Sequence, residues 1–274
     1  MELSVEHVTT YRYSRPVTES YTVVHLQPRT TPHQFCTRYE LEIEPGARWF
    51  EYVDRFGNEV QHFAIVPEHD ELRIVARSQV VTMARGEPHP EPERRPGEHY
   101  ELTQPSPYVA LSDDVRAIAE HEIDAPRGDP AAYFVAAGKY VHDTFGYVKG
   151  ATNVRTTVHE ALEKRTGVCQ DFAHVLIALA RARGIPARYA SGYVFAGEGI
   201  VGGEASHAWA EAHVPGFGWL GVDPTNDKVV DDSFVLVALG RDYGDVSPTR
   251  GLFRGRAEGE LSVNVAVEPT GDQQ

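Results

Sequence analysis

Cys169 is one of only two cysteines in this chain of 274 residues, and its setting favours a reactive thiol. It opens a segment, residues 169–183, whose apolar side chains recur at helical spacing and which a Gly-Ile-Pro stop signal follows. The free N–H groups and the dipole at a helix N-terminus favour an anion, so a thiol placed there is favoured as the nucleophilic thiolate. A small, buried and inert cysteine is the alternative interpretation, and position alone does not decide between the two.

A thiolate nucleophile needs a base, and the base needs a group that orients it. His207 opens the strand-like segment HAWAEAHV, and Asp223 ends the next one, GWLGVD. If these segments form a hairpin centred on Pro215, His207 lies directly opposite Asp223, within reach of an imidazole–carboxylate hydrogen bond. A register slip of one residue would put them on opposite faces. Taken singly, each also has a structural interpretation, as a strand-end histidine and as a turn cap before Pro224.

Cysteine, histidine and aspartate could instead bind a metal, but the usual spacings are missing. The sequence contains no HExxH motif and no paired CxxC motif, and it has no phosphate-binding glycine motif. His207 and His213 on one strand would be about 20 Å apart, too far to share an ion. We therefore expect neither a metal nor another cofactor.

The charge balance excludes some partners. Lysine and arginine number 26 against 40 aspartates and glutamates, a net charge of −14. Nucleic acids and anionic membranes both require positive surface, so neither is expected as the partner. The N-terminus lacks the basic and apolar pattern of a secretory signal, and two cysteines provide no disulfide framework. The expected location is the cytoplasm.

The elements that must position these residues fall into an all-β part and a mixed part. Residues 1–83 read as several short strands, among them 39–44, with a hairpin around Gly57, and indicate a sandwich-like domain. The proline-rich stretch 84–110 reads as a linker or long loop. Residues 111–274 show helices and then strands, the last at 261–267, and we predict one catalytic domain there. The fold class is α+β.

Three helix starts are marked in the mixed part. Ser112 is a plausible N-cap, Asp129 precedes a proline at a first helical position, and Thr157 with Glu160 forms a capping-box pattern. These signals place three helices ahead of the one that Cys169 opens.

Four motifs, taken together, are more specific than any single residue. RTGVCQDFAH, GIPAR, SHAWAE and GWLGVDPTN follow one another between residues 165 and 226. Over about residues 145–227 the chain resembles the bacterial transglutaminase-like superfamily, relatives of papain-type thiol enzymes. Residues 11–59, with YRYSRPV and DRFGNE, resemble the β-rich N-terminal domain that often precedes this core. The resemblance implies a papain-like core of helices followed by an antiparallel sheet.

The resemblance also implies roles for single residues. Cys169 would be the nucleophile, His207 the general base and acid, and Asp223 the group that orients His207. The backbone N–H of Cys169 would stabilise the oxyanion. Asn153 is a weaker candidate for a second donor, and a loop asparagine before the Thr157 cap is the alternative interpretation.

Three functions follow as hypotheses. The first is a cysteine-dependent amide hydrolase, a protease or peptidase, that acts through a thioester on a peptide or protein. The second keeps the same three residues but transfers the acyl group, for example from a glutamine side chain, to an amine. The third is a non-catalytic scaffold that holds a peptide. The sequence leaves the substrate and the oligomeric state open.

Overall fold

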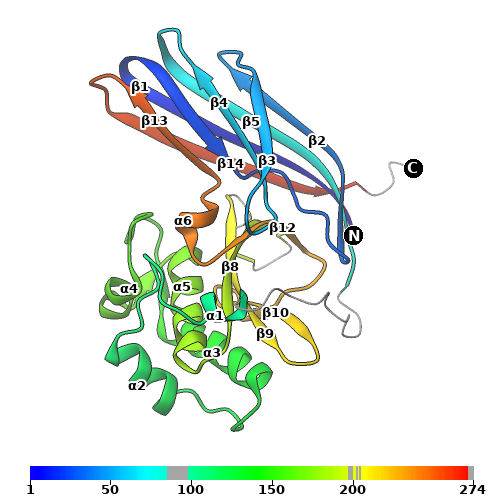
Figure 1. The fold of residues 1–274 in the computed structure, drawn as a ribbon, viewed down its shortest axis with the longest axis vertical. Helices are drawn as coiled ribbons and strands as arrows, with labels where there is room; N and C mark the ends of the chain where they lie inside the picture. Colours follow the sequence, from blue (N-terminus) through cyan, green and yellow to red (C-terminus); the bar gives the residue numbers. More distant parts are fainter. Residues whose placement is uncertain (85–97, 197–199, 202, 204, 271–274) are drawn as a thin grey trace.

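The computed structural model describes residues 1–84, 98–196, 200, 201, 203 and 205–270. An antiparallel sheet forms one unit, and a mixed unit of helices around a second sheet lies against one end of it (Figure 1). This arrangement confirms the predicted α+β class, with an all-β unit preceding a mixed core. Among the described residues, no helix is both long and apolar enough to cross a membrane.

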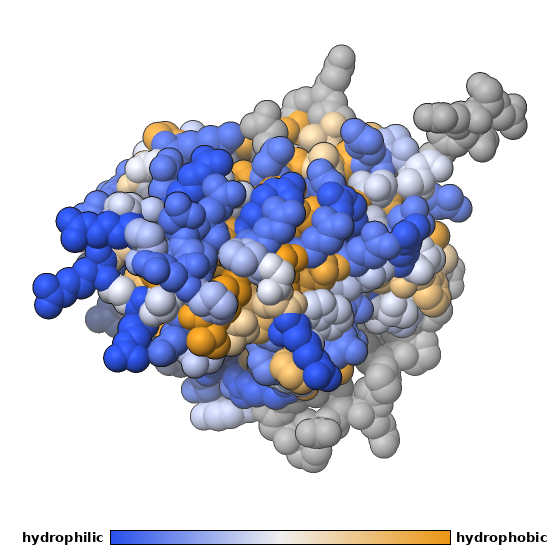
Figure 2. Space-filling model, turned by 90° about the horizontal axis from the view of Figure 1, so that it is seen from above, coloured by the Kyte–Doolittle hydropathy of each residue, from blue (hydrophilic) through white to orange (hydrophobic). Residues whose placement is uncertain are grey.

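The N-terminal unit is built from five consecutive strands, paired in the order β2-β5-β1-β4-β3. These are β1 (Glu2–Val24), β2 (Gln34–Glu44), β3 (Trp49–Val53), β4 (Glu59–Ile65) and β5 (His69–Thr82). The predicted hairpin at residues 54–58 joins β3 to β4, where Gly57 adopts a positive φ of 76° that glycine tolerates without strain. The surface of the molecule seen in Figure 2 is largely hydrophilic, with apolar patches between the charged side chains.

Two further strands from the C-terminal end of the chain complete this sheet. They are β13 (Thr249–Arg254) and β14 (Gly259–Pro269), and both pair antiparallel with β1. This corrects the assignment of all of residues 111–274 to the catalytic domain. The alternation of residues 261–267 predicts a strand but carries no information on its neighbour. With 23 residues, β1 is long enough to pair with β5 and β14 along one half and with β4 and β13 along the other.

The second unit packs its helices against a five-stranded sheet with the order β11-β10-β9-β8-β12. The strands of this sheet are β8 (Ala187–Val194), β9 (His207–Val214), β10 (Gly218–Asp223), β11 (Lys228–Val229) and β12 (Phe234–Gly240). The short strands β6 (Gly146–Tyr147) and β7 (Thr166–Gly167) form a separate parallel pair. The helices of the second unit are α1 (Glu98–Glu101), α2 (Asp113–His121), α3 (Pro130–Thr144), α4 (Val158–Lys164), α5 (Cys169–Ala182) and α6 (Tyr243–Val246). The predicted caps at Ser112, Asp129 and Thr157 are confirmed, each side chain accepting from a backbone N–H of its own first turn.

The structure describes residues 84 and 98–110 of the stretch expected to be a linker or long loop, and there residues 98–101 form α1 while residues 102–110 form a loop that is partly buried rather than fully exposed. Residues 85–97 lie outside the described residues. Beyond them, Leu102 and Val109 are buried, and the carbonyl of Leu102 accepts a hydrogen bond of 3.0 Å from the backbone of Ala187. The guanidinium of Arg181 also donates to the carbonyl of Gln104 at 3.0 Å. Residues 102–109 are therefore part of the second unit, because apolar and polar partners both fix them to it.

The two units share one apolar core. Leu3 and Val5 of β1 and Val265 of β14 are buried in the same cluster as apolar residues from the helices of the second unit. Polar contacts also cross the boundary, since the side chain of Asn58 both donates to and accepts from the backbone of Leu239, at 2.8 Å each. This packing fixes the N-terminal sheet beside the second unit.

Candidate active site

Cys169 is the first residue of α5, as the sequence predicts. The preceding Val168 has no side-chain oxygen to cap the helix, and Asp171 compensates by accepting from the backbone N–H of Val168 at 2.8 Å. Asp171 is buried, and its second partner is the hydroxyl of Thr152 at 2.7 Å. Gly167 leaves room for this carboxylate, because a Cβ there would lie 2.6 Å from its Oδ2. The turn before α5 is thus fixed, and Cys169 projects from a rigid helix end that stays partly accessible.

His207 begins β9 and Asp223 ends β10, and these strands form the predicted hairpin. The register differs from the expected one by two residues, since Val214 pairs with Gly218 and the turn is centred on Gly216 rather than Pro215. Gly216 has a positive φ of 77°, which suits the middle of this three-residue loop. A shift of two leaves both side chains on one face, so His207 and Asp223 become diagonal neighbours instead of directly opposed ones.

The two side chains nevertheless meet. Nε2 of His207 donates to Oδ2 of Asp223 at 2.8 Å, and both side chains are completely buried. Asp223 accepts two more hydrogen bonds, from the backbone of Thr225 at 2.9 Å and from the amide of Asn226 at 2.7 Å. Burial alone would raise the pKa of Asp223, but the bond to His207 and the other donors outweigh it and lower the pKa.

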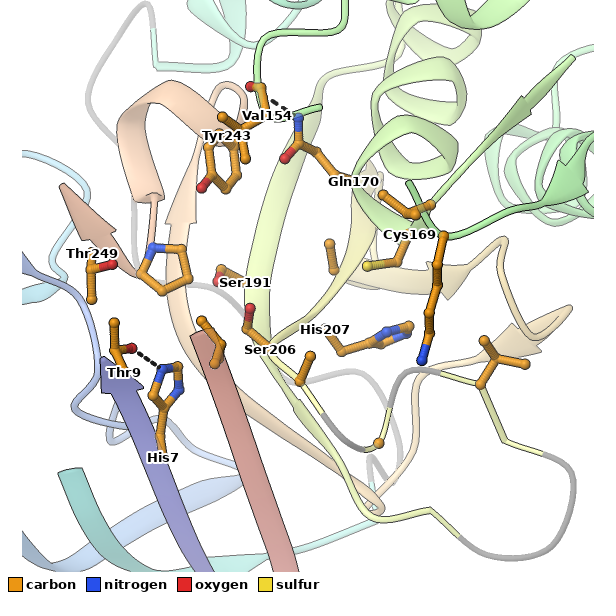
Figure 3. Close-up of a pocket in the computed structure, with 18 of the residues that line it drawn as sticks. His7, Thr9, Val154, Cys169, Gln170, Ser191, Ser206, His207, Tyr243 and Thr249 are labelled. Carbon is orange, nitrogen blue, oxygen red and sulfur yellow. Dashed lines mark hydrogen bonds between the residues drawn. The ribbon is translucent and has the colours of Figure 1, made fainter. Parts of the chain in front are cut away.

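The thiol of Cys169 lies beside the imidazole of His207 (Figure 3). Burial disfavours the charged ring, but the hydrogen bond to Asp223 and the nearby sulfur of Cys169 more than offset it and raise the pKa of His207 to about 10. Nε2 is engaged by Asp223, so Nδ1 is the nitrogen left to exchange a proton with the sulfur. The structure therefore brings the three predicted residues together in the order sulfur, imidazole, carboxylate.

Two further residues, Asn226 and Trp209, contact this group; the sequence gives Asn226 no role and offers for Trp209 either shielding of the imidazole or core packing. Asn226 donates to Asp223 and also exchanges hydrogen bonds with the backbone of Val201, so it ties the carboxylate to the loop after β8. Trp209 is fully buried, and its ring stacks toward His207 with centroids 6.5 Å apart. Asn226 is the last residue of the GWLGVDPTN motif, and its position three residues after Asp223 is the sequence signal that could have identified it. Trp209 shares the face of His207 by strand alternation.

Asn153 is not part of this arrangement. Its side chain is exposed, and Oδ1 accepts from the backbone N–H of Arg155 at 2.9 Å, the geometry of a loop turn. It does not line the cavity beside Cys169. The structure thus favours the loop interpretation of Asn153 over a role in the oxyanion hole. The backbone N–H of Cys169 remains the candidate donor, since first-turn N–H groups have no intrahelical acceptor.

A cavity of about 830 Å³ opens beside Cys169 and His207. Its walls come from both units. The second unit contributes residues of α5, β8, β9, α6 and part of the loop that follows β8, and the N-terminal sheet contributes residues of β1, β13 and β14. The side chains from the sheet are His7, Thr9, Thr249, Leu261 and Val263. Sequence reasoning missed all five, because no local pattern shows that the two ends of the chain meet at the site.

This geometry suits acyl transfer through sulfur. A base in contact with the thiol can take its proton, the buried carboxylate stabilises the resulting imidazolium, and the cavity gives room for a carbonyl group at the sulfur. A thiol, an imidazole and a carboxylate held by a helix end and a hairpin on an α+β core are the features of the transglutaminase-like class.

Comparisons with known proteins agree with this class. The bacterial transglutaminase-like N-terminal region matches residues 3–81, and the transglutaminase-like superfamily matches residues 118–224. The chain belongs to the transglutaminase-like superfamily. An uncharacterised protein of Mycobacterium leprae is 32% identical over 97% of this chain and 98% of its own length.

Two further similarities differ in how much of the chains they cover. A protein-glutamine gamma-glutamyltransferase of Pseudomonas aeruginosa is 33% identical over 40% of this chain but only 18% of its own length. The crystal structure of a candidate cysteine protease from Cytophaga hutchinsonii covers all of this chain and 92% of its own, with a TM-score of 0.79 and 24% identity. At that identity the likeness shows a common fold.

Proposed function

We propose that this protein is a cysteine-dependent amide hydrolase that acts on a peptide or protein. The single observation that carries the proposal is the placement of the partly accessible Cys169 beside the buried, hydrogen-bonded pair of His207 and Asp223, at the wall of an open cavity. The thiolate attacks the amide carbonyl, and the backbone N–H of Cys169 stabilises the oxyanion. His207 then protonates the departing amine, and the C–N bond breaks to leave a thioester. Water, losing a proton to His207, releases the acid and regenerates the thiol.

Transfer of the acyl group to an amine is the second candidate. The similarity to a protein-glutamine gamma-glutamyltransferase favours it, since that alignment spans 126 residues. The same three side chains would form the thioester, and an amine would replace water in the second step. A glutamine peptide incubated with a tagged amine separates the two. Incorporated tag indicates transfer, and released ammonia or cleaved peptide without tag indicates hydrolysis.

We expect iodoacetamide at neutral pH to alkylate Cys169 much faster than Cys36. Cys169 lies beside an imidazolium, whereas burial raises the pKa of the Cys36 thiol in the N-terminal sheet. The rates are read by mass spectrometry of peptides containing each cysteine. His207→Ala should slow the labelling of Cys169 and leave that of Cys36 unchanged. Equal, slow labelling of both thiols would refute the thiolate–imidazolium pair and favour a non-catalytic scaffold.

The raised pKa of His207 predicts the pH dependence of turnover. The imidazolium needed to protonate the leaving amine persists as pH rises past 6.5 and is lost only as pH passes about 10. We expect kcat/KM for a peptide p-nitroanilide to keep its plateau through neutral pH and to fall near pH 10. Alkylation by iodoacetamide, which needs no acid, should not fall there. An alkaline fall in kcat/KM centred near 6.5 would contradict this assignment.

A further inference from the structure

We propose that Leu261 and Val263 of β14 form the binding site for an apolar side chain on the acyl side of the substrate. This inference rests on the proposed acyl chemistry at Cys169 and adds the substrate class, an amide whose acyl part carries an aliphatic or aromatic side chain. The N-terminal sheet would then select the substrate rather than only support the catalytic unit.

The exposure of the apolar row on β14 is the first observation. Leu261, Val263, Val265 and Val267 share one face of the strand by alternation. Val265 is only 5% exposed and Val267 packs against the same core, so this part of the face is used in joining the two units. Leu261 is 52% and Val263 37% exposed, and both line the cavity beside Cys169. The apolar face thus continues past the inter-unit core and into the cavity.

The backbone that presents these side chains is held by its pairing with β1, which is itself tied to the second unit. Val263 pairs with Thr9 and Leu261 with Tyr11 on β1. The hydroxyl of Thr9 bonds Nε2 of the buried His7 at 2.8 Å, and Nδ1 of His7 bonds the hydroxyl of Tyr193 on β8 at 3.0 Å. Burial lowers the pKa of His7 to about 4, so this link between the units stays uncharged at neutral pH.

A second link fixes the other end of the wall. The hydroxyls of Tyr11 and Thr249 are 2.6 Å apart, and Thr249 itself lines the cavity. The apolar pair therefore stands on a wall that is formed before any ligand binds, and little ordering free energy is lost on binding.

The position of the wall relative to His207 assigns it to the acyl side. In Figure 3, Cys169 and His207 lie at one end of the cavity, Ser191 and Ser206 come next, and Thr9 and Thr249 lie beyond them. The leaving amine must stay near His207, which protonates it. The acyl part, which remains on the sulfur, is free to extend away from the imidazole toward β14. Burying an aliphatic side chain against Leu261 and Val263 favours such a substrate over one with glycine at this position.

Peptidyl chloromethyl ketones test this without knowledge of the natural substrate. The thiolate displaces chloride from the methylene carbon, so a C–S bond forms, a C–Cl bond breaks, and the peptide occupies the acyl side. We expect acetyl-leucine chloromethyl ketone to label Cys169 faster than the acetyl-glycine compound. Leu261→Asp should lower that ratio by about tenfold, a typical effect of a lost apolar contact in a pocket. Leu261→Ala should lower it less, and it serves as the variant with the smaller effect on folding.

Leu252→Asp is the matched control. Leu252 is 66% exposed on β13, in the same sheet, and does not line the cavity, so its variant should keep the leucine-to-glycine ratio of the unaltered protein. If iodoacetamide labels Cys169 rapidly in every variant but the ratio is the same in all of them, the acyl-side site is refuted while the proposed function stands. Slow iodoacetamide labelling of the unaltered protein refutes the proposed function and this inference with it.

Discussion

Cys169→Ala should reduce amide hydrolysis by at least about 10⁴-fold while the protein stays folded. The substitution removes the sulfur that forms the thioester and leaves every other hydrogen bond of the site in place. The side chain of Cys169 does not cap the helix, because the carboxylate of Asp171 accepts the hydrogen bond from the backbone N–H of Val168 at the start of α5. The helix should therefore still begin at the same residue in the variant. Turnover of a peptide p-nitroanilide measures the loss, and circular dichroism with thermal unfolding measures the fold.

Cys36→Ala is the control for this result. Cys36 lies on β2 in the N-terminal sheet, where its thiol donates to the carbonyl of Arg38 at 3.4 Å, and it does not line the cavity. We expect neither activity nor fold to change. Loss of activity in the Cys36 variant, without unfolding, would show that the wrong thiol has been assigned to the chemistry.

Asp223→Asn should reduce kcat/KM by at least about 100-fold, and a serine triad loses about 10⁴-fold from the equivalent change. Three donors point at the two oxygens of this buried carboxylate, from His207, Thr225 and Asn226. An asparagine has one acceptor oxygen, so at least one of these donors must face an NH₂ group. If that donor is Nε2 of His207, the ring adopts the tautomer with its proton toward the sulfur and cannot act as base.

The other orientation of the asparagine also impairs the site. With its oxygen toward His207 the tautomer survives, but the negative charge that helps raise the pKa of His207 to about 10 is gone. The alkaline fall of kcat/KM should then move to lower pH, which a merely structural role for Asp223 would not produce. A variant with unchanged kcat/KM and pH profile would exclude Asp223 from the mechanism.

The sequence predicts the three central residues well because their signals are local. Cys169 begins an apolar helical segment whose end is marked by Gly184 and Pro186. His207 and Asp223 lie at the outer ends of two strands joined by a turn that contains glycine. The hairpin register was two residues off, since the sequence alone did not distinguish Pro215 from Gly216 as the centre of the turn. Because the shift is two residues, the side chains of His207 and Asp223 still lie on the same face of the hairpin. As diagonal neighbours they are close enough to form their hydrogen bond.

The parts that the sequence did not predict are those set by contacts between distant segments. No strand is predicted from the sequence at residues 234–240, which form β12. All seven residues of β12 are buried, so the strand lacks the alternation of apolar and polar residues that reveals a half-buried strand. The partner of β14 is about 260 residues away, as Glu6 pairs with Ala266. Cavity residues such as Thr9 and Val263 could not be found without that pairing, because neither carries a chemical signal of its own.

The pairing of β1 with β13 and β14 has a consequence for how the protein is made. A nascent chain that has emerged only to about residue 248 already contains the sulfur, the imidazole and the carboxylate, yet one wall of its cavity is missing. Closing so long a loop is slow and entropically costly, so β13 and β14 would join the sheet late. Substrate selection would therefore mature only after these two strands have emerged and paired with β1, later than the sulfur, the imidazole and the carboxylate come together.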